Sequence, residues 1–445
     1  MSRRAAPKAN SEALWRAGTP VSGPLAGHRV LELGSTVAGP FCGRLLADFG
    51  AEVIKVEPPE GDPVRTMGKH VDGKSLYAAS ILRNKQLVSL DLRVPAAREV
   101  VARLARHCDV VVENFRPGTL EKWGIGYERL SQDNPGLVMV RISGFGQSGP
   151  YRDRPGYGFL GDAVGGMLHI NGYPDRPPVR AAVPVTDMVT ALYGAFGAVM
   201  ALLARKTTGQ GQVVDAALYE SAFSLMEAHV PAFDKLGHVA MRAGSRLPGS
   251  TPNSLYPTAD GGFIAMAASS DPVFRRLAAV MGQPELGEDP RFASALARVD
   301  HQDALDAIIG EWTSGFLLDS LEPMLQQRDV PASRVFTMAD IFRDPHFAAR
   351  GSIVHAPDAD LGSIAMPAPA PRLSATPGAI IHAGGPIGAD TVDVLDRIAG
   401  LTRTEIDALL ASGAAFDATH ARPSFANPVA NPVANPAAKP AENPA

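Results

Sequence analysis

The sequence predicts an α/β protein built on a doubly wound, mainly parallel sheet. Three observations support this fold class. Short apolar runs rich in β-branched residues alternate with amphipathic stretches, as in successive βαβ units. The first unit joins its strand and helix through a short loop. With 445 residues, 45% of them hydrophobic and 20% charged, the chain is also long enough to bury a large core and to form more than one domain.

The elements follow one another in a regular order. A strand over 28–35, a helix over 41–50 and a strand over 51–57 form the opening unit. Further strands are expected at 86–92, 109–114, 137–143 and 212–218, separated by helices at 95–107 and 127–134 and by a long helix that begins near Asp187. A second group, downstream of a Gly/Ser/Pro-rich loop at 242–257, comprises a strand at 262–268 and helices at 271–282, 303–315 and 317–328.

Changes in composition along the chain predict the domain boundaries. We expect a flexible N-terminal arm at 1–23, a large α/β domain at 24–235 and a small domain at 245–350. A segment at 355–415, Pro-rich and strand-poor as far as Pro377, should return to pack on the large domain. Residues 417–445 repeat Asn, Pro and Ala without a hydrophobic face, which predicts a disordered tail.

Composition and targeting signals narrow the class of function. The net charge of −4, without a basic run, argues against nucleic acid as a partner. No uninterrupted apolar stretch approaches membrane-spanning length, and the N-terminus lacks the apolar core of a secretory signal. The two cysteines, Cys42 and Cys108, suit a reducing cytoplasm and exclude a cysteine-built metal site. The histidines lack ligand spacing, so no metal is expected.

The candidate catalytic residue is Asp187, at the start of the long helix. Helix N-terminal N–H groups and the positive end of the dipole favour an ionised carboxylate there. An ionised carboxylate in apolar surroundings is a plausible nucleophile toward an activated acyl group. From the local sequence alone, a helix cap formed by Asp187 or Thr186 is the commoner interpretation.

Other motifs point to no alternative chemistry. GFGQSG at 144–149 matches a dinucleotide-binding pattern, but the prolines and glycines that follow cannot form the phosphate-binding helix. Cys42 has no evident His partner and is expected in the core. Neither a nucleophile elbow nor a P-loop is present. Six basic residues could form a phosphate-facing rim, although surface solubilisation is the default interpretation of each: Arg44, Arg65, Lys69, Lys85, Arg116 and Lys122.

Taken together, six segments in this order resemble the class III CoA-transferase (CaiB/BaiF) family, which also contains 2-methylacyl-CoA racemases. They are PLAGHRVLELGSTVAGPFCGRLLADFGAEVIKVEPPEGDPVR, RNKQLVSLDLR, VVENFRPGTLEKWGIGYERL, ISGFGQSGP, PVTDMVTALYG and TGQGQVVDAALYE. The resemblance extends from about Pro24 to about Leu410. It implies a Rossmann-like large domain with a smaller α+β domain and an interlocked homodimer.

The resemblance also implies roles for individual residues. Asp187 of the PVTD motif matches the family's covalent nucleophile. CoA, a substrate and not a permanently bound cofactor, would lie along Val37, Ala38, Asp91, Arg93, Asn114, Phe115, Arg116, Lys122, Ser143, Gly144, Phe145 and Gly146. An arginine often follows VIKVE in the family, but Pro58 stands here, so Arg65 or Arg93 would have to contact the nucleotide end.

A second departure favours the transferases over the racemases. The racemases carry a GHD motif whose histidine is a second acid/base, whereas Tyr157 and Gly158 stand at the corresponding positions here. Racemisation needs two groups of suitable pKa, and a tyrosine is a poor replacement near neutral pH. Tyr157 is equally well explained as a packing residue or a substrate contact at the edge of the site.

These considerations predict a CoA-transferase acting through an aspartyl-CoA thioester. Similarity around PVTD to succinyl-CoA-using dicarboxylate transferases suggests succinyl-CoA as donor. The loop containing Gly249, Ser250 and Asn253 is a candidate lid. Any of Arg180, Arg242 and Arg246 could bind a second carboxylate, though solvent exposure explains at least two of them. The alternatives are an acyl-CoA racemase with an unrecognised second base and a CoA-binding protein without turnover.

Overall fold

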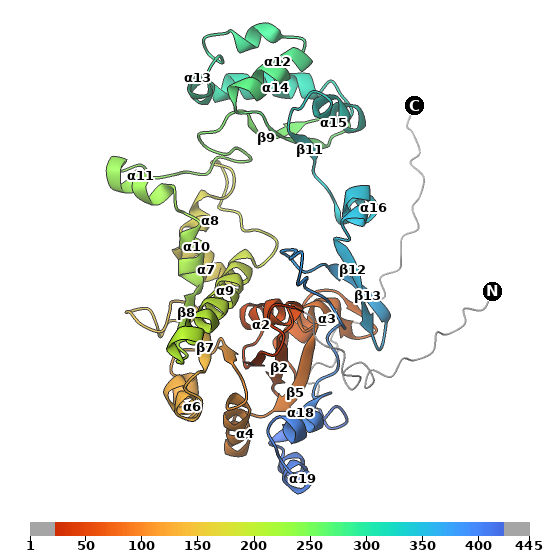
Figure 1. Ribbon diagram of the computed structural model, residues 1–445. Helices are drawn as coiled ribbons and strands as arrows, with labels where there is room; N and C mark the ends of the chain where they lie inside the picture. Colours follow the sequence, from red (N-terminus) through yellow and green to blue (C-terminus); the bar gives the residue numbers. More distant parts are fainter. Residues whose placement is uncertain (1–22, 422–445) are drawn as a thin grey trace, which may run out of the picture. The chain divides into compact units, whose positions relative to one another are not determined.

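The computed structural model describes residues 23–421, which form two compact units. The first unit contains residues up to 155, residues 187–217 and residues from 354 onward, and the second contains 156–186 and 218–353. The predicted N-terminal arm and Asn-Pro tail fall almost entirely outside the described residues. Figure 1 labels many of the elements of both units.

The first unit is organised around a seven-stranded sheet in the order β14-β5-β2-β1-β6-β7-β8. Six strands are parallel, and β14 pairs antiparallel with β5 at one edge. The strands are β1 (Arg29–Glu32), β2 (Glu52–Glu57), β5 (Lys85–Leu90), β6 (Val110–Glu113), β7 (Val138–Ser143), β8 (Val213–Ala217) and β14 (Ala415–Phe416). This confirms the predicted mainly parallel sheet.

The strand order creates a topological switch point between β1 and β6. From β1 the chain continues to β2 and β5 on one side, and then crosses to β6, β7 and β8 on the other. Loops that leave the carboxyl ends of β1 and β6 therefore diverge in opposite directions. In open α/β sheets, ligands bind in the crevice that such loops create.

Helices cover both faces of the sheet because successive strand residues point to opposite sides. Leu31 faces a core with α4 (Pro95–Ala105), α18 (Thr391–Arg397) and α19 (Arg403–Ser412). Val30 faces a core with α2 (Ala38–Asp48) and α9 (Val185–Thr208). The remaining strands and α-helices of this unit are β3 (His70–Val71), β4 (Lys74–Ser75), α3 (Leu76–Ile81), α5 (Thr119–Lys122), α6 (Tyr127–Asp133), β12 (Ile353–Asp358) and β13 (Gly362–Pro367).

Helix α9 packs on the sheet through small residues. Ala191, Ala195 and Ala198 are buried in the core that contains Val140. A Cβ added to Gly194 would lie 3.1 Å from Val140 Cγ1, so this position requires close backbone approach. Within residues 23–421, α9 alone is long and apolar enough to cross a membrane by length and composition. This corrects the expectation that no apolar stretch approaches that length. One face of α9 packs in the core of the sheet.

The second unit contains helices around a three-stranded antiparallel sheet in the order β11-β10-β9. Its core includes Tyr256, Ile264, Phe274, Leu277 and Ile309. The strands are β9 (Asn253–Pro257), β10 (Phe263–Ala267) and β11 (Ala332–Arg334). The helices are α7 (Gly158–Val164), α8 (Met167–Ile170), α10 (Leu218–Ser224), α11 (His229–Leu236), α12 (Asp271–Val280), α13 (Ala295–Asp300), α14 (Gln302–Thr313), α15 (Leu318–Gln326), α16 (Met338–Arg343) and α17 (Pro345–Ala349).

The division of the chain differs from the predicted boundaries in one respect. Residues 156–186 and 218–235, expected in the large domain, group with the second unit. The reason is local packing between α7 and α10: a Cβ on Gly165 would lie 2.7 Å from Ala222 Cβ, and one on Gly161 would lie 3.1 Å from Leu218 Cβ. Two glycines thus let these helices approach closely, and sequence periodicity does not reveal such pairing.

Candidate active site

Most of the residues expected to bind CoA lie at the carboxyl edge of the main sheet. Val37 and Ala38 follow β1, Asp91 and Arg93 follow β5, and the Asn114–Arg116 turn and Lys122 follow β6. Ser143 ends β7, and Gly144, Phe145 and Gly146 come directly after it. Because these strands are parallel, their carboxyl ends share one edge. The fold therefore brings these segments, distant in sequence, to the edge where ligands bind.

The loops on either side of the switch point are joined by one side chain. Asn114 Oδ1 accepts a hydrogen bond from Ser35 N at 2.7 Å, and its Nδ2 donates to Ser35 O at 2.9 Å. Gly34 and Gly39 leave room for this amide, because a Cβ on Gly34 would lie 3.0 Å from Asn114 Oδ1. The backbone leading to Val37 is thus fixed to the end of β6.

A network of buried ion pairs also holds the loop that follows β1. Lys55 Nζ lies 2.7 Å from Asp62 and 3.4 Å from Glu32, and it also donates to Gly34 O. Lys85 Nζ lies 2.7 Å from Glu32 and donates to Pro40 O at 2.7 Å. Burial alone would favour the neutral amine of Lys55, but the carboxylates of Asp62 and Glu32 raise its pKa. The network ties two strands to the loop after β1 and to the start of α2.

Asp62 also fixes the conformation of that loop. Its Oδ1 accepts hydrogen bonds from Thr36 N and Val64 N, each at 2.9 Å. Thr36 has φ of 71°, a left-handed conformation that costs a β-branched residue strain. The hydrogen bond to Asp62 helps to hold it there. The residue before Val37 is therefore held in one conformation, which suits the expected CoA contact at Val37.

A second buried acid holds the turn after β6. Glu113 Oε2 accepts a hydrogen bond from Phe115 N at 2.8 Å, and its Oε1 accepts one from Arg141 Nε at 2.8 Å. Arg141 continues to Glu121 of α5 at 2.7 Å. Burial raises the pKa of Glu113 to about 7, while Arg141 opposes the rise. Arg116 and Lys122, carried by this braced segment, are exposed and available to an anionic ligand.

The two arginines considered as substitutes at the Pro58 position differ in availability. Arg65 is committed, because its guanidinium donates two hydrogen bonds of 2.7 Å to Glu57 and a third to Gly385 O at 3.0 Å. The Arg93 side chain is 70% exposed, and among the described residues it pairs with Asp91 and Glu60. Of the two, Arg93 is therefore the one whose guanidinium is accessible to an anionic ligand.

The turn after β7 is also preorganised. Gly146 N donates to Ser143 Oγ at 3.0 Å, and Gln147 N donates to Asp215 Oδ2 at 2.9 Å. Gly146 has φ of 86°, which a side chain would strain. The hydroxyl of Ser143 thus closes a tight turn.

Asp187 lies inside the first turn of α9, as its third residue, and not at the position that precedes the helix. The structure therefore does not support the interpretation of Asp187 as the cap residue. The preceding Thr186 is buried and donates its hydroxyl hydrogen to Asp162 Oδ1 of α7. The helix dipole favours the ionised carboxylate at Asp187. Its charge reaches the Tyr77 phenol of α3, whose pKa is raised by burial and by Asp187.

The remaining predicted contacts belong to the second unit. Tyr157 precedes α7 and is 73% exposed. Gly249 is exposed, and Ser250 Oγ accepts a hydrogen bond of 3.4 Å from Asn253 Nδ2. The loop is anchored at Thr251, whose carbonyl accepts a hydrogen bond of 3.1 Å from the buried Arg298. This anchor restrains the loop proposed as a lid.

The three arginines considered for a second carboxylate already have partners. Arg246 lies 2.7 Å from both Asp303 and Asp306. Arg242 donates to Tyr173 O at 3.1 Å. Arg180 is exposed, and its guanidinium lies 4.8 Å from the centre of the Phe159 ring. None of these three arginines is therefore a buried cation without a partner.

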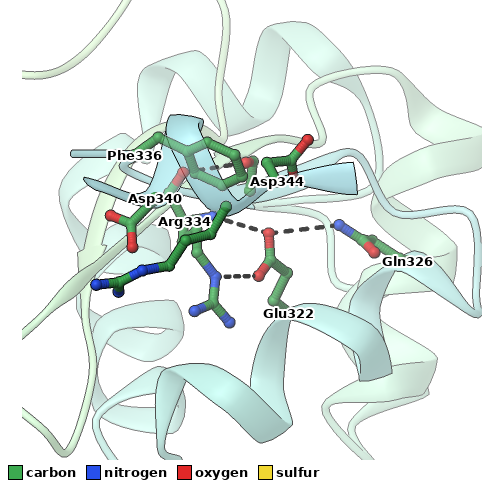
Figure 2. Close-up of a pocket in the computed structure, with 8 residues that line it drawn as sticks. Glu322, Gln326, Arg334, Phe336, Asp340 and Asp344 are labelled. Atoms are coloured by element: carbon green, nitrogen blue, oxygen red, sulfur yellow. Dashed lines mark hydrogen bonds and ion pairs between the residues drawn. The ribbon is translucent and has the colours of Figure 1, made fainter. Parts of the chain in front are cut away.

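The second unit also contains a polar pocket of about 420 Å³ that includes none of the predicted residues. Figure 2 shows Arg334 donating to Glu322, which Gln326 also contacts. Arg334 lies in addition 2.8 Å from Asp319. These charges neutralise one another, so the pocket is explained as a structural ion cluster between α15, β11 and α16.

Several groups around the site were missed by sequence reasoning. Glu32, Lys55, Asp62 and Tyr77 were not singled out, and Lys85 was assigned to the surface although it is fully buried. The available signal was a charge inside an otherwise apolar strand, as at Glu32, Lys55 and Lys85. Within residues 23–421, no group of three His, Cys, Asp or Glu side chains is arranged to hold a metal ion.

Comparison with known proteins identifies the class to which this fold and site belong. Residues 25–391 match the model of CoA-transferase family III, so the chain belongs to that family. A solved CAIB/BAIF family protein from Brucella suis has a TM-score of 0.76 and 34% identity, covering 85% of this chain and 100% of its own. The predicted family and CoA-transferase activity are confirmed.

Two curated relatives indicate the branch within the family. Succinyl-CoA--D-citramalate CoA-transferase of Chloroflexus aurantiacus is 49% identical over 390 residues, covering 87% of this chain and 97% of its own. Human succinyl-CoA:glutarate CoA-transferase is 32% identical over 394 residues, covering 88% and 89% respectively. Both relatives are transferases, in agreement with the absence of the racemase motif at Tyr157 and Gly158.

Proposed function

We propose that the enzyme transfers CoA from succinyl-CoA to a dicarboxylic acid through a CoA thioester on Asp187. The observation that carries the substrate class is the identity of 49% with a succinyl-CoA-dependent transferase over almost the whole length of that relative. The position of Asp187 in the first turn of α9 supports its role as nucleophile. The particular acceptor depends on side chains that the relatives need not share.

The chemistry proceeds by successive acyl exchanges. The Asp187 carboxylate attacks the thioester carbonyl of succinyl-CoA, the C–S bond breaks, and a mixed anhydride and CoA thiolate form. The thiolate then attacks the aspartyl carbonyl, which releases succinate and leaves a thioester between Asp187 and CoA. The acceptor carboxylate attacks this thioester and expels CoA thiolate. The thiolate finally attacks the acceptor carbonyl, giving the new acyl-CoA and regenerating Asp187.

Each step exchanges one activated acyl group for another, so the cycle is balanced without ATP. Carboxylate and thiolate are the only nucleophiles required, and each is regenerated. The developing oxyanions require N–H donors held in place before reaction. CoA would lie along the carboxyl edge of the sheet, close to the protein backbone at Val37 and Gly144. Its phosphates would lie near Arg93, Arg116 and Lys122.

An interlocked homodimer is part of this proposal. The face of α9 opposite the sheet exposes large apolar side chains: Leu192, Tyr193, Phe196, Met200 and Leu203. An uncovered stripe of this kind is typical of a surface buried by another protein. A second copy of the chain is the occupant that the family resemblance implies. Phe196→Glu should then convert the dimer to a monomer or an aggregate, as measured by size-exclusion chromatography with light scattering. The control Glu227→Gln, at an exposed polar residue, should remain a dimer.

The predicted cytoplasmic location also remains a proposal. It is supported by Cys42 and Cys108, which are both buried free thiols. Burial raises the pKa of each thiol well above its usual range, so neither is a candidate nucleophile.

Intact-mass measurement tests the covalent mechanism. The purified protein is incubated with succinyl-CoA and no acceptor, alongside Asp187→Ala and the control Asp175→Ala, whose carboxylate is exposed. A CoA-sized adduct on the wild type and the control, but not on Asp187→Ala, is expected. An adduct that persists in Asp187→Ala, or exchange of the α-proton without any adduct, would overturn the proposal.

A further inference from the structure

We infer that Arg44, together with the hydroxyl of Tyr77, binds the distal carboxylate of the dicarboxylic acyl group whose other end reacts at Asp187. This inference rests on the proposed function, because it takes Asp187 as the reacting group. All three residues belong to the first unit.

Arg44 is a buried cation that lacks a full counter-charge. Its side chain, on α2, is 13% exposed, and its guanidinium lies 4.1 Å from the centre of the Phe41 ring. The nearest carboxylate, that of Asp48, is 3.8 Å from its Nε. Among the described residues, Arg44 Nε has no hydrogen-bond partner. Burying an incompletely paired charge is costly, so the position calls for an explanation beyond packing.

Asp48 balances the charge of Arg44 only in part, because both of its oxygens already accept hydrogen bonds from other side chains. The fully buried Arg83 donates to both of them, at 2.9 and 2.6 Å, and Asn84 Nδ2 donates to one at 3.1 Å. The bidentate geometry commits the charge of Asp48 to Arg83. Arg44 is therefore the second guanidinium next to a single carboxylate.

Tyr77 contributes a second polar group without a partner. Its ring packs in the cluster that also contains Phe41, over which Arg44 lies. Its hydroxyl is buried and makes no hydrogen bond to any described residue. Burial and the Asp187 carboxylate raise the pKa of Tyr77, whereas the Arg44 guanidinium opposes the rise. The phenol therefore stays protonated at neutral pH, close enough to both charges to interact with each.

The chemistry of these groups selects a carboxylate. A guanidinium N–H and a phenolic O–H are both donors, so together they fit an anion with two acceptor oxygens. Burial and the neighbouring Arg83 lower the pKa of Arg44 to about 10, which leaves it charged at neutral pH. Succinyl-CoA and a dicarboxylic acceptor each carry one carboxylate besides the group that reacts. A single cation beside Tyr77, the phenol that interacts with both Arg44 and Asp187, would thus serve both halves of the reaction.

Donor selectivity tests this assignment. The donors are succinyl-CoA and butyryl-CoA, which has a methyl group in place of the distal carboxylate, with glutarate as a fixed acceptor. In ping-pong kinetics, kcat/KM for the donor reports only the first half-reaction, so effects on the acceptor cancel. We expect the wild type to favour succinyl-CoA, and Arg44→Gln to lower kcat/KM for succinyl-CoA by about tenfold to a hundredfold. The value for butyryl-CoA should change less than about threefold.

Three further variants separate recognition from structure. Arg44→Lys should restore part of the preference, because it keeps the charge but loses the fork. Tyr77→Phe removes a single hydroxyl and should lower the succinyl-CoA value about threefold to tenfold. Arg103→Gln removes the same charge from a half-exposed arginine of α4 and should leave kcat/KM unchanged for both donors. The thermal midpoint of Arg44→Gln should be no lower than that of the wild type, since the removed charge is not fully paired.

Equal loss with both donors in Arg44→Gln and Tyr77→Phe would overturn the inference, and so would a wild type that does not favour succinyl-CoA. Should Arg44→Gln fail to fold, its contribution is structural and the inference is likewise overturned for Arg44, with Tyr77→Phe deciding for the hydroxyl. Failure of the proposed mechanism is separate. It would appear as CoA-transferase activity that survives in Asp187→Ala. The ratio of kcat/KM for the two donors is measured on the wild type and the Arg44 and Tyr77 variants, so the two failures can be told apart.

Discussion

The Asn114 carboxamide makes two hydrogen bonds to the backbone of Ser35, accepting from the N–H at 2.7 Å and donating to the carbonyl at 2.9 Å. These two hydrogen bonds join the loops that follow β1 and β6, the adjacent strands that form the topological switch point. Both groups of Ser35 are satisfied by one planar side chain, so the loop cannot rotate without breaking both bonds. The loop that reaches Val37 is therefore held in one conformation at the edge where we propose that CoA binds.

Asn114→Ala should weaken CoA binding more than it weakens the fold. The substitution leaves Ser35 N and O without partners, and the loop can then adopt several conformations. We expect KM for the acyl-CoA donor to rise about tenfold, equivalent to about 1.4 kcal/mol, with a smaller change in kcat. Steady-state kinetics with varied succinyl-CoA measure this.

Asn134→Ala provides the control for that prediction. Asn134 Nδ2 likewise bridges backbone groups, donating to Ala105 O at 3.1 Å and to Cys108 O at 2.8 Å. It precedes β7, whereas the loops proposed to bind CoA follow the strands, so its loss should affect stability and leave KM unchanged. A rise in KM of equal size in both variants would show that the effect is general loosening.

Lys55→Met should be strongly destabilising, although methionine has a similar length. The change leaves the buried carboxylates of Asp62 and Glu32 without their common cation. Breaking a buried ion pair in this way typically costs about 3–5 kcal/mol. Urea unfolding followed by circular dichroism should show a loss in this range.

The double variant Lys55→Met/Asp62→Asn tests the cause. If uncompensated charge is the origin of the loss, removing the Asp62 charge should recover part of it, because the two sites share one interaction. The amide can still accept the hydrogen bond from Thr36 N. Additive losses in the double variant would assign the effect to packing instead.

The sequence predicted the sheet well because its strands are buried on both faces. Continuous apolar runs such as the one over 109–114 carry a strong signal, and their alternation with helices determines the fold class. The position of Asp187 at the start of α9 could also be predicted, because helix ends have local sequence signals. Its chemical role required the resemblance to a family.

The buried charges could not be predicted from local patterns. Arg44 and Lys85 were assigned to the surface because a charged side chain is buried only when a partner neutralises it. The partner of Lys85 is Glu32, on another strand, and the acid nearest Arg44 is already bound to Arg83. Such pairing depends on strand order, which periodicity does not encode. A charge inside an apolar strand is the sequence signal that should prompt the search.

The pH dependence of stability should contain a contribution from Asp390. Asp390 precedes α18, and its Oδ2 accepts a hydrogen bond from Leu87 N of β5 at 2.7 Å. Burial raises its pKa from 3.8 to about 6. A carboxyl with a raised folded-state pKa favours folding when protonated. Its contribution is therefore complete below the unfolded pKa and is lost as the pH rises through about 6.

Asp390→Asn should remove this dependence, because the amide oxygen can accept the same hydrogen bond but does not ionise. Relative to the variant, the wild type should lose up to about 3 kcal/mol of unfolding free energy between pH 4 and pH 7. Urea unfolding at intervals of half a pH unit measures the difference, with the exposed Asp396→Asn on the same helix as the control. A difference that is independent of pH, or one that the control reproduces, would mean that Asp390 is ionised in the folded protein throughout this range.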